Sequence, residues 1–174
     1  MQTVNEEIEL QTVCIQGLGF VGAAMAAAVA QSRDSERKCQ YNVIGVELPT
    51  QEGQRRVDAI NNGEFPLETV DEELLSATSN GVKEGNLSAT TDQTIYQKAQ
   101  VVIVDVALDI STTQDNPTVD FSILKEAVRT IGCSIGANTL VIVETTVAPG
   151  TCEHIIAPIL YEECENRGIE RDSI

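Results

Sequence analysis

The stretch at residues 13–32, "VCIQGLGFVGAAMAAAVAQS", decides the fold of this 174-residue chain. It is apolar, carries no charged side chain, and is punctuated by Gly17, Gly19 and Gly22. Such a stretch can cross a membrane, fill a core, or form a strand and a helix joined by a turn that binds a phosphate. The rest of the chain distinguishes these three possibilities.

A membrane-spanning segment is the first possibility. The apolar stretch lies at the lower edge of the length that a spanning helix needs, and Gln16 and the glycines interrupt it. A secretory signal begins with basic residues, whereas this chain begins with Glu6, Glu7 and Glu9. We therefore expect neither a membrane span nor a secretory signal.

The chain is strongly acidic, with a formal net charge of −16 and a pI of about 4.2. A protein of this charge repels nucleic acid and the anionic surface of a membrane. Apolar residues make up 42% of the chain, which is ordinary for a soluble domain with a real core. We expect a soluble, cytoplasmic protein that binds neither nucleic acid nor a membrane.

The cysteines and the histidine do not predict a metal site. No two cysteines have the C-x-x-C spacing of a zinc or redox site, and His154 is the only histidine. We expect most of the thiols to be reduced and packed as small hydrophobic groups. The five are Cys14, Cys39, Cys133, Cys152 and Cys164.

Strand-like and helix-like segments alternate along the chain. The runs at 101–108 and 139–146 are apolar without polar alternation, which indicates strands that are buried on both faces. Pro158 should kink or shorten the last helix. The pattern predicts an α/β fold with a Rossmann-like, doubly wound, mostly parallel sheet and helices on both faces. We expect strands at residues 12–16, 41–47, 87–91, 101–108 and 139–146, and helices after residue 19 and at 54–63, 70–81, 120–132 and 150–168.

The three glycines match the pattern G-x-G-x-x-G between an expected strand and an expected helix. Gly17 would permit the tight turn, Gly19 would let the backbone approach a pyrophosphate, and Gly22 would let the helix pack closely on the strand. The N-terminus of the helix would offer its free N–H groups to the phosphates. This context predicts a dinucleotide-binding domain, and the lack of a following G-K-[ST] argues against a P-loop.

An acidic residue is expected at the end of the second strand, where it accepts hydrogen bonds from the adenosine ribose. Glu47 occupies that position. A carboxylate there would repel a 2′-phosphate, so NAD is favoured over NADP. Arg55 and Arg56 weaken this preference, because an arginine nearby can accommodate a 2′-phosphate.

In open α/β sheets, ligands bind beyond the carboxyl ends of the strands. The segment "ETTVAPGT" at 144–151 follows the last expected strand, with Thr151 expected to cap the next helix. One interpretation is a simple strand-to-helix turn. The other is a loop that places Thr145 or Thr146 against the nicotinamide or the substrate.

Together these residues resemble the amino-terminal half of the UDP-glucose/GDP-mannose dehydrogenase family. The resemblance rests on "GLGFVG", "RRVDAINNGEFP", "EGNLSATTD" and "VETTVAPGT", which occur in the family's order. Members of this family oxidise the C6 hydroxyl of a UDP- or GDP-sugar to a uronic acid, using two NAD and no metal. The resemblance therefore implies NAD as cofactor, a nucleotide sugar as substrate, and a homodimer for the full-length enzyme.

The resemblance assigns roles to the residues of the glycine turn. Gly17, Gly19 and Gly22 match the family's cofactor-binding glycines. The backbone N–H groups near Phe20 and Val21 would face the pyrophosphate.

Three further positions match the family. Glu47 matches the acid that binds the ribose, and Arg56 matches a basic position near the adenosine end. Thr146 matches the threonine of the family's T-V-P loop, which lies beside the nicotinamide and helps to position the catalytic water.

The chain also departs from the family's pattern. Val106 and Ala107 replace the usual Pro-Thr after the fourth strand, and Asp105 and Asp109 are additional acids without an assigned role. The family's nucleophilic cysteine and its lysine belong to central and carboxy-terminal portions that would follow residue 174. We expect residues 1–11 to be an N-terminal extension, residues 12–174 to be the NAD-binding Rossmann domain, and this domain alone to be inactive.

Two alternatives remain at this stage. The chain could be the first domain of a β-hydroxyacid-type dehydrogenase, although the Thr-Val-Ala-Pro-Gly-Thr loop argues against that. It could also be a non-catalytic module that senses NAD.

Overall fold

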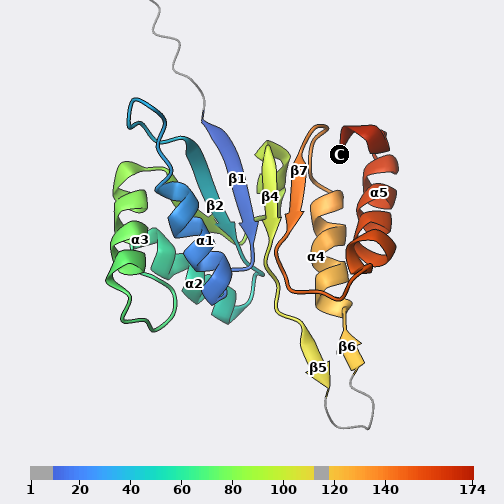
Figure 1. Cartoon of the computed structure of the whole chain (residues 1–174), viewed down its shortest axis with the longest axis horizontal. Helices are drawn as coiled ribbons and strands as arrows, with labels where there is room; N and C mark the ends of the chain where they lie inside the picture. Colours follow the sequence, from blue (N-terminus) through green and yellow to red (C-terminus); the bar gives the residue numbers. More distant parts are fainter. Residues whose placement is uncertain (1–9, 112–117) are drawn as a thin grey trace, which may run out of the picture.

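Parallel strands form the centre of the molecule. The computed structural model describes residues 10–111 and 118–174, and within them five strands form a parallel sheet in the order β3-β2-β1-β4-β7. This order places later strands on both sides of β1, as a doubly wound sheet requires. Figure 1 shows β2, β1, β4 and β7 side by side. The five strands are β1 (Gln11–Gln16), β2 (Tyr41–Val46), β3 (Leu87–Thr90), β4 (Val101–Val104) and β7 (Leu140–Val143).

Helices cover the two faces of this sheet (Figure 1). Helices α1 to α3 lie on one side, and α4 and α5 lie on the other. The α/β fold with a doubly wound parallel sheet is therefore confirmed. The helices are α1 (Phe20–Ala30), α2 (Gln51–Asn61), α3 (Glu72–Glu84), α4 (Ser122–Gly132) and α5 (Ala157–Glu165), with shorter 3₁₀ segments η1 (Gln93–Lys98) and η3 (Arg171–Ser173).

Side chains of β1 alternate between two hydrophobic cores. Val13 and Ile15 point to the core under α1 and α2, where they meet Ala26 and Ala30. Cys14 points to the opposite core, under α4 and α5. The run of small residues in α1 lets this helix lie close against the sheet, as the sequence indicated.

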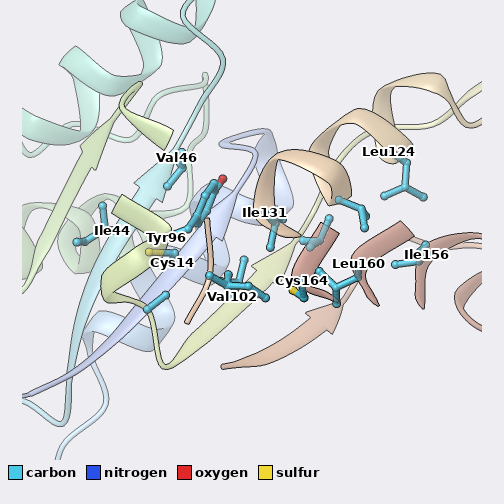
Figure 2. Close-up of a cluster of buried hydrophobic side chains, with 14 residues drawn as sticks. Cys14, Ile44, Val46, Tyr96, Val102, Leu124, Ile131, Ile156, Leu160 and Cys164 are labelled. Carbon is cyan, nitrogen blue, oxygen red and sulfur yellow. The ribbon is translucent and has the colours of Figure 1, made fainter. Parts of the chain in front are cut away.

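The second core contains a buried polar pair. Figure 2 shows Tyr96 beside Cys14 and Val46, at the strand side of the cluster. The Tyr96 hydroxyl donates a hydrogen bond to the side-chain oxygen of Gln16, and both side chains are buried. Burial raises the pKa of the Tyr96 hydroxyl far above its ordinary value, so it stays protonated as a donor.

Strand β4 is shorter than expected. It ends at Val104, not at residue 108, because Thr145 takes over the hydrogen bonding beyond it: the Val106 N–H donates to the Thr145 hydroxyl (2.9 Å). The chain then forms a separate antiparallel ribbon, β5 (Asp109–Ser111) with β6 (Thr118–Asp120), which projects beyond the sheet at the bottom of Figure 1.

The expectation that the last strand is buried on both faces is wrong. Among the strands of the described ranges, β7 is at the edge of the sheet and pairs only with β4. Val141 and Val143 pack against the core under α4 and α5, while Leu140 and Ile142 are 56% and 42% exposed. The apolar run of a strand identifies a sheet position, but it does not show whether a helix covers the second face.

The boundaries of α3 and of the last helical segment also differ from the expectations. Helix α3 continues through Gly81 to Glu84, because a glycine at 81 allows close approach to Leu87, and the left-handed Gly85 (φ 78°) ends the helix. In the last segment, a π-helical turn η2 (Cys152–Ile156) precedes α5, which begins just before Pro158.

The structure also bears on the expected cap at Thr151 and on the N-terminal end of the chain. The Thr151 side chain makes no capping hydrogen bond, so its expected role as a cap is wrong. Strand β1 begins at Gln11, inside the expected N-terminal extension, and residues 1–9 of that extension lie outside the described residues.

The buried pair of Gln16 and Tyr96 generates a stability prediction. Replacing Tyr96 by Phe leaves the buried Gln16 oxygen without its donor, which should lower the free energy of unfolding by about 1–3 kcal/mol. Urea denaturation measures this change. Tyr41→Phe, at a half-buried tyrosine of β2, is the control and should change stability by less than about 0.5 kcal/mol. Equal effects of the two changes would contradict the prediction.

Candidate functional site

The turn between β1 and α1 is held by close backbone contacts. Gly17 has a φ of 95°, and a Cβ atom there would lie 2.1 Å from the carbonyl oxygen of Asp105. A Cβ at Gly22 would lie 2.0 Å from the carbonyl oxygen of Gly17. Both positions therefore require glycine, for the reasons that the motif predicts: a tight turn at the first and close packing at the third.

Gly19 differs from the other two glycines. A Cβ atom built there meets no described atom within 4 Å, and its φ of −61° suits any residue. Folding alone does not explain a glycine at this position. An open space above the backbone is what the approach of a phosphate would need.

The first turn of α1 lies directly after this open position. The helix begins at Phe20, so the N–H groups of Phe20 and Val21 lie where an α-helix has no carbonyl partner to offer them. Both side chains are about half exposed, and the ring of Phe20 packs edge-on against Phe65 at 5.5 Å between ring centroids. The helix dipole adds a partial positive charge here, which favours an anion.

Glu47 directly follows β2, and its carboxylate is buried beside the glycine turn. Its Oε1 atom accepts hydrogen bonds from the backbone N–H of Leu18 (2.8 Å) and from Nη1 of Arg56 (3.0 Å). Its Oε2 atom accepts from the backbone N–H of Leu48 (3.2 Å). These donors compensate the buried charge and fix the direction of the carboxylate.

A cleft of about 280 Å³ joins these groups. The residues that the sequence singled out supply much of its lining: the glycine turn, the end of β2, Arg56 on α2 and residues 105–107 after β4. The remaining side comes from η1 and α4, which no motif singled out, because only the folding of the sheet brings them to this edge. The added lining residues from those elements are Gln93, Ile123, Glu126, Ala127 and Thr130.

A second, larger cleft of about 590 Å³ lies beside the first one, past the end of β4. Both are lined by Asp105, Val106 and Ala107, so the two clefts share a wall. Thr145 and Thr146 border the second cleft from the end of β7. Two adjoining clefts at the carboxyl edge of a parallel sheet match the shape of a two-part ligand such as a dinucleotide.

The two threonines have different environments. Thr145 is buried, and its hydroxyl bridges β4 and β7 by accepting from the Val106 N–H and contacting the Val106 carbonyl oxygen at 3.0 Å. Thr146 is exposed at the second cleft. The hydroxyl of Thr145 thus holds the wall of the site, and Thr146 is an exposed residue at the border of the second cleft.

Asp105, which had no assigned role, lies at the centre of the site. Its side chain is next to Gly22, where its Oδ2 atom would be 3.1 Å from an added Cβ. Burial raises the pKa of the Asp105 carboxyl, and a hydrogen bond from the Gly22 N–H partly offsets this. A carboxylate therefore sits at the positive end of α1. The side chain of Asp109 lies outside the described part of the chain.

The thiols lie away from both clefts. Cys14 and Cys164 are buried, as expected, but Cys133 and Cys152 are exposed. Burial raises the pKa of Cys14 to about 12, so this thiol is not a nucleophile at neutral pH. In the described ranges, no three His, Cys, Asp or Glu side chains come together as a potential metal site.

Comparison with known proteins agrees with this geometry. Residues 11–173 match the model of the NAD binding domain of the UDP-glucose/GDP-mannose dehydrogenase family. The chain belongs to this family, and the cofactor of its domain is NAD. This membership favours neither a β-hydroxyacid-type dehydrogenase nor a non-catalytic module.

The individual relatives are named as dehydrogenases of two kinds of nucleotide sugar. The chain is 31% identical to GDP-mannose 6-dehydrogenase of Pseudomonas aeruginosa over 160 residues, which covers 89% of this chain and 33% of that protein. It is 28% identical to UDP-N-acetyl-D-mannosamine dehydrogenase of Methanococcus vannielii, over 87% of this chain and 32% of the relative. The chain thus spans about a third of the length of these relatives.

Solved structures show the same similarity. The crystal structure of NDP-N-acetyl-D-galactosaminuronic acid dehydrogenase from Methanosarcina mazei matches with a TM-score of 0.79 and 26% identity, over 91% of this chain and 32% of the other. A GDP-mannose dehydrogenase ternary complex from Pseudomonas aeruginosa matches with a TM-score of 0.70 and 26% identity, over 87% and 32%. Within the described part of the chain, none of the helices combines the length and apolar character that crossing a membrane requires.

The three glycines generate the first prediction for the site. Gly22→Ala places a methyl group against the carbonyl of Gly17 and should lower the free energy of unfolding by about 1–3 kcal/mol or more. Gly19→Ala should leave stability unchanged or slightly raised, yet weaken NAD binding, because its methyl group occupies the open space. Urea denaturation and calorimetry with NAD⁺ measure the two effects. Wild-type NAD affinity in the Gly19→Ala variant would contradict the phosphate-binding role of this position.

The carboxylate of Asp105 generates the second prediction. A carboxyl whose pKa is raised by folding binds more protons in the native state, so it lowers stability as the pH rises through that pKa. Asp105→Asn keeps an acceptor for the Gly22 N–H and should be more stable than wild type at pH 7. The gain should stay below about 1 kcal/mol, because solvent screens this half-exposed group.

Urea denaturation between pH 7 and pH 3.5 tests the sign of this effect. The difference between Asp105→Asn and wild type should shrink as the pH falls and Asp105 becomes protonated. A variant that is less stable than wild type at pH 7 would show that the hydrogen bond to Gly22 outweighs the cost of burial.

Proposed function

We propose that this chain holds NAD along the carboxyl edge of its sheet, as part of an enzyme that oxidises the C6 hydroxyl of a UDP- or GDP-sugar to a uronic acid. One observation carries the proposal: the buried carboxylate of Glu47 is fixed next to the glycine turn, in a cleft that shares a wall with the cleft at Thr146. That arrangement fits a dinucleotide from its ribose to its nicotinamide.

Different residues bind different parts of the cofactor. Glu47 accepts hydrogen bonds from the adenosine ribose, with Arg56 beside it. The N–H groups of Phe20 and Val21 face the pyrophosphate, which approaches the backbone at Gly19. The opening at Thr146, in the wall that Thr145 holds together, receives the nicotinamide end.

The chemistry comes from the bound cofactor and from groups that position the substrate. NAD, when bound, supplies the acceptor for a hydride from the sugar C6. The exposed hydroxyl of Thr146 orients a water molecule at the second cleft. Val106 and Ala107 contribute apolar lining to the cleft at this position.

Complete oxidation to an acid needs a second hydride transfer, which requires covalent capture of the aldehyde by a nucleophile. Among the described residues, no thiol lines either cleft. We therefore assign cofactor binding to this chain and the capture step to residues of the enzyme outside the two clefts described above. The isolated chain accordingly binds NAD without turning over a sugar.

The names of the relatives support a nucleotide sugar as the substrate class, since they specify a GDP-sugar in one case and a UDP-sugar in the other. Such substrates occur in the cytoplasm, where polysaccharide precursors are made, and we place the enzyme there. We further propose that the complete enzyme is a homodimer.

The role of Glu47 is tested by Glu47→Gln, which keeps an oxygen for the Leu18 N–H but removes the charge. NAD⁺ affinity measured by calorimetry should fall about tenfold or more, because hydrogen bonds to a carboxylate are the stronger ones. The exposed Glu170→Gln is the control for loss of a negative charge and should bind NAD⁺ as wild type does. Unchanged affinity in Glu47→Gln would refute the ribose assignment.

A further inference from the structure

Two consecutive arginines of α2 lie next to the adenosine end of the site, one lining the first cleft and the other joined to it through Glu52. Arg56 lines the first cleft, is 26% exposed, and contacts Glu47. Arg55 precedes it on α2 and donates to the backbone carbonyl of Pro66 (3.1 Å). In dinucleotide-binding domains, an arginine near the acid of the second strand can accommodate the 2′-phosphate of NADP. From the sequence alone, Glu47 favours NAD over NADP, and these two side chains weaken that preference.

Glu52 holds both arginines. Its carboxylate accepts from Arg55 in a two-pronged contact, at 2.7 Å from Nη2 to Oε1 and 2.9 Å from Nε to Oε2. Its Oε1 atom also accepts from Nε of Arg56 at 3.2 Å. The spacings i, i+3 and i, i+4 put all three side chains on one face of the helix.

The position of Glu52 depends on where α2 begins. Thr50 caps the helix by accepting from the Gly53 N–H (3.0 Å). A Cβ at Gly53 would lie 2.1 Å from the carbonyl oxygen of Leu48, so this glycine lets the helix start close to the end of β2. Glu52 thus stands in the first turn, near the adenosine end of the cleft.

The charges of this group balance. Glu47 and Glu52 carry two negative charges, and Arg55 and Arg56 carry two positive ones. Hydrogen bonds from Arg55, together with one from Arg56, hold the pKa of Glu52 at about 2, so it is ionised at neutral pH. A phosphate monoester brings a further charge of about −1.5 to −2. Such a phosphate would face two carboxylates, and the positive charge of both arginines would already be neutralised by Glu47 and Glu52.

We propose that Glu52 is a specificity-determining residue, which makes the adenosine end of the site reject NADP by neutralising Arg55 and Arg56. The proposal rests on NAD binding at this cleft. Glu52 acts through the arginines and does not itself contact the ribose. Glu47 binds the ribose, and Glu52 keeps the neighbouring guanidinium groups from attracting a 2′-phosphate.

The test is calorimetry with NAD⁺ and NADP⁺ on wild type and Glu52→Gln. Removing the charge of Glu52 leaves one positive charge in excess beside the cleft, so NADP⁺ affinity should rise about tenfold, with NAD⁺ affinity within about twofold of wild type. The gain for NADP⁺ should shrink between 0.05 and 0.5 M NaCl, because salt screens exposed charges. Glu52→Asp, which keeps the charge, should retain the preference for NAD⁺.

Asp58→Asn is the matched control. Asp58 lies on the same helix, is exposed, and accepts from the side-chain amide of Gln54 (2.8 Å). Its replacement changes the net charge of the chain by the same amount, and it should leave the ratio of NADP⁺ to NAD⁺ affinity unchanged. Circular dichroism and urea denaturation establish that each variant is folded.

Two results would overturn the inference while leaving NAD binding intact. One is an unchanged affinity ratio in Glu52→Gln, and the other is an equal rise in Asp58→Asn. If wild type binds neither dinucleotide, the proposed function itself is wrong, and the inference falls with it. The wild-type titration with NAD⁺ therefore separates the two failures.

Discussion

The structure depends on one steric constraint, the meeting of three backbone segments with no space for a side chain. Gly17 lies against the carbonyl of Asp105, and Gly22 lies against the carbonyl of Gly17. This contact fixes the end of β1, the start of α1 and the end of β4 relative to one another. The same contact creates an anion-binding position, because it aims the first N–H groups of α1 at the space where β1 and β4 end.

The second determinant of the site is how buried charge is compensated. Glu47 is buried, and its carboxylate is tolerable there because Leu18, Leu48 and Arg56 donate to it. Arg56 is shared in turn with Glu52, so the adenosine end is one connected group of charges. Asp105 lies at the opposite side of the glycine turn and adds negative charge near the phosphate position. The site therefore binds an anionic ligand with little excess positive charge, and backbone N–H groups carry much of the attraction.

The errors of the sequence predictions have physical causes. An apolar run indicates a strand in the sheet. Strand β4 nevertheless ends early, because the Val106 N–H donates to the hydroxyl of Thr145 and not to the backbone of a neighbouring strand. In α3, Gly81 resembles a helix end and is instead a point of close packing against Leu87. Helix α2 begins at Gln51, three residues earlier than expected. Because the expected helix did not include Glu52, its pairing with the arginines was not predicted. Local sequence patterns contain none of these tertiary contacts.

The sequence by itself determined the fold class, the glycine turn and the acid at the end of β2. These features follow from local rules: apolar runs form strands, and only glycine fits a positive φ or a backbone contact without a Cβ. The tertiary structure alone decided that η1 and α4 complete the cleft, that Thr145 supports the wall while Thr146 borders the second cleft, and that Glu52 neutralises two arginines. Such relations join residues that are distant in sequence or depend on where a helix begins, and they exist only once the sheet has brought its strand ends together.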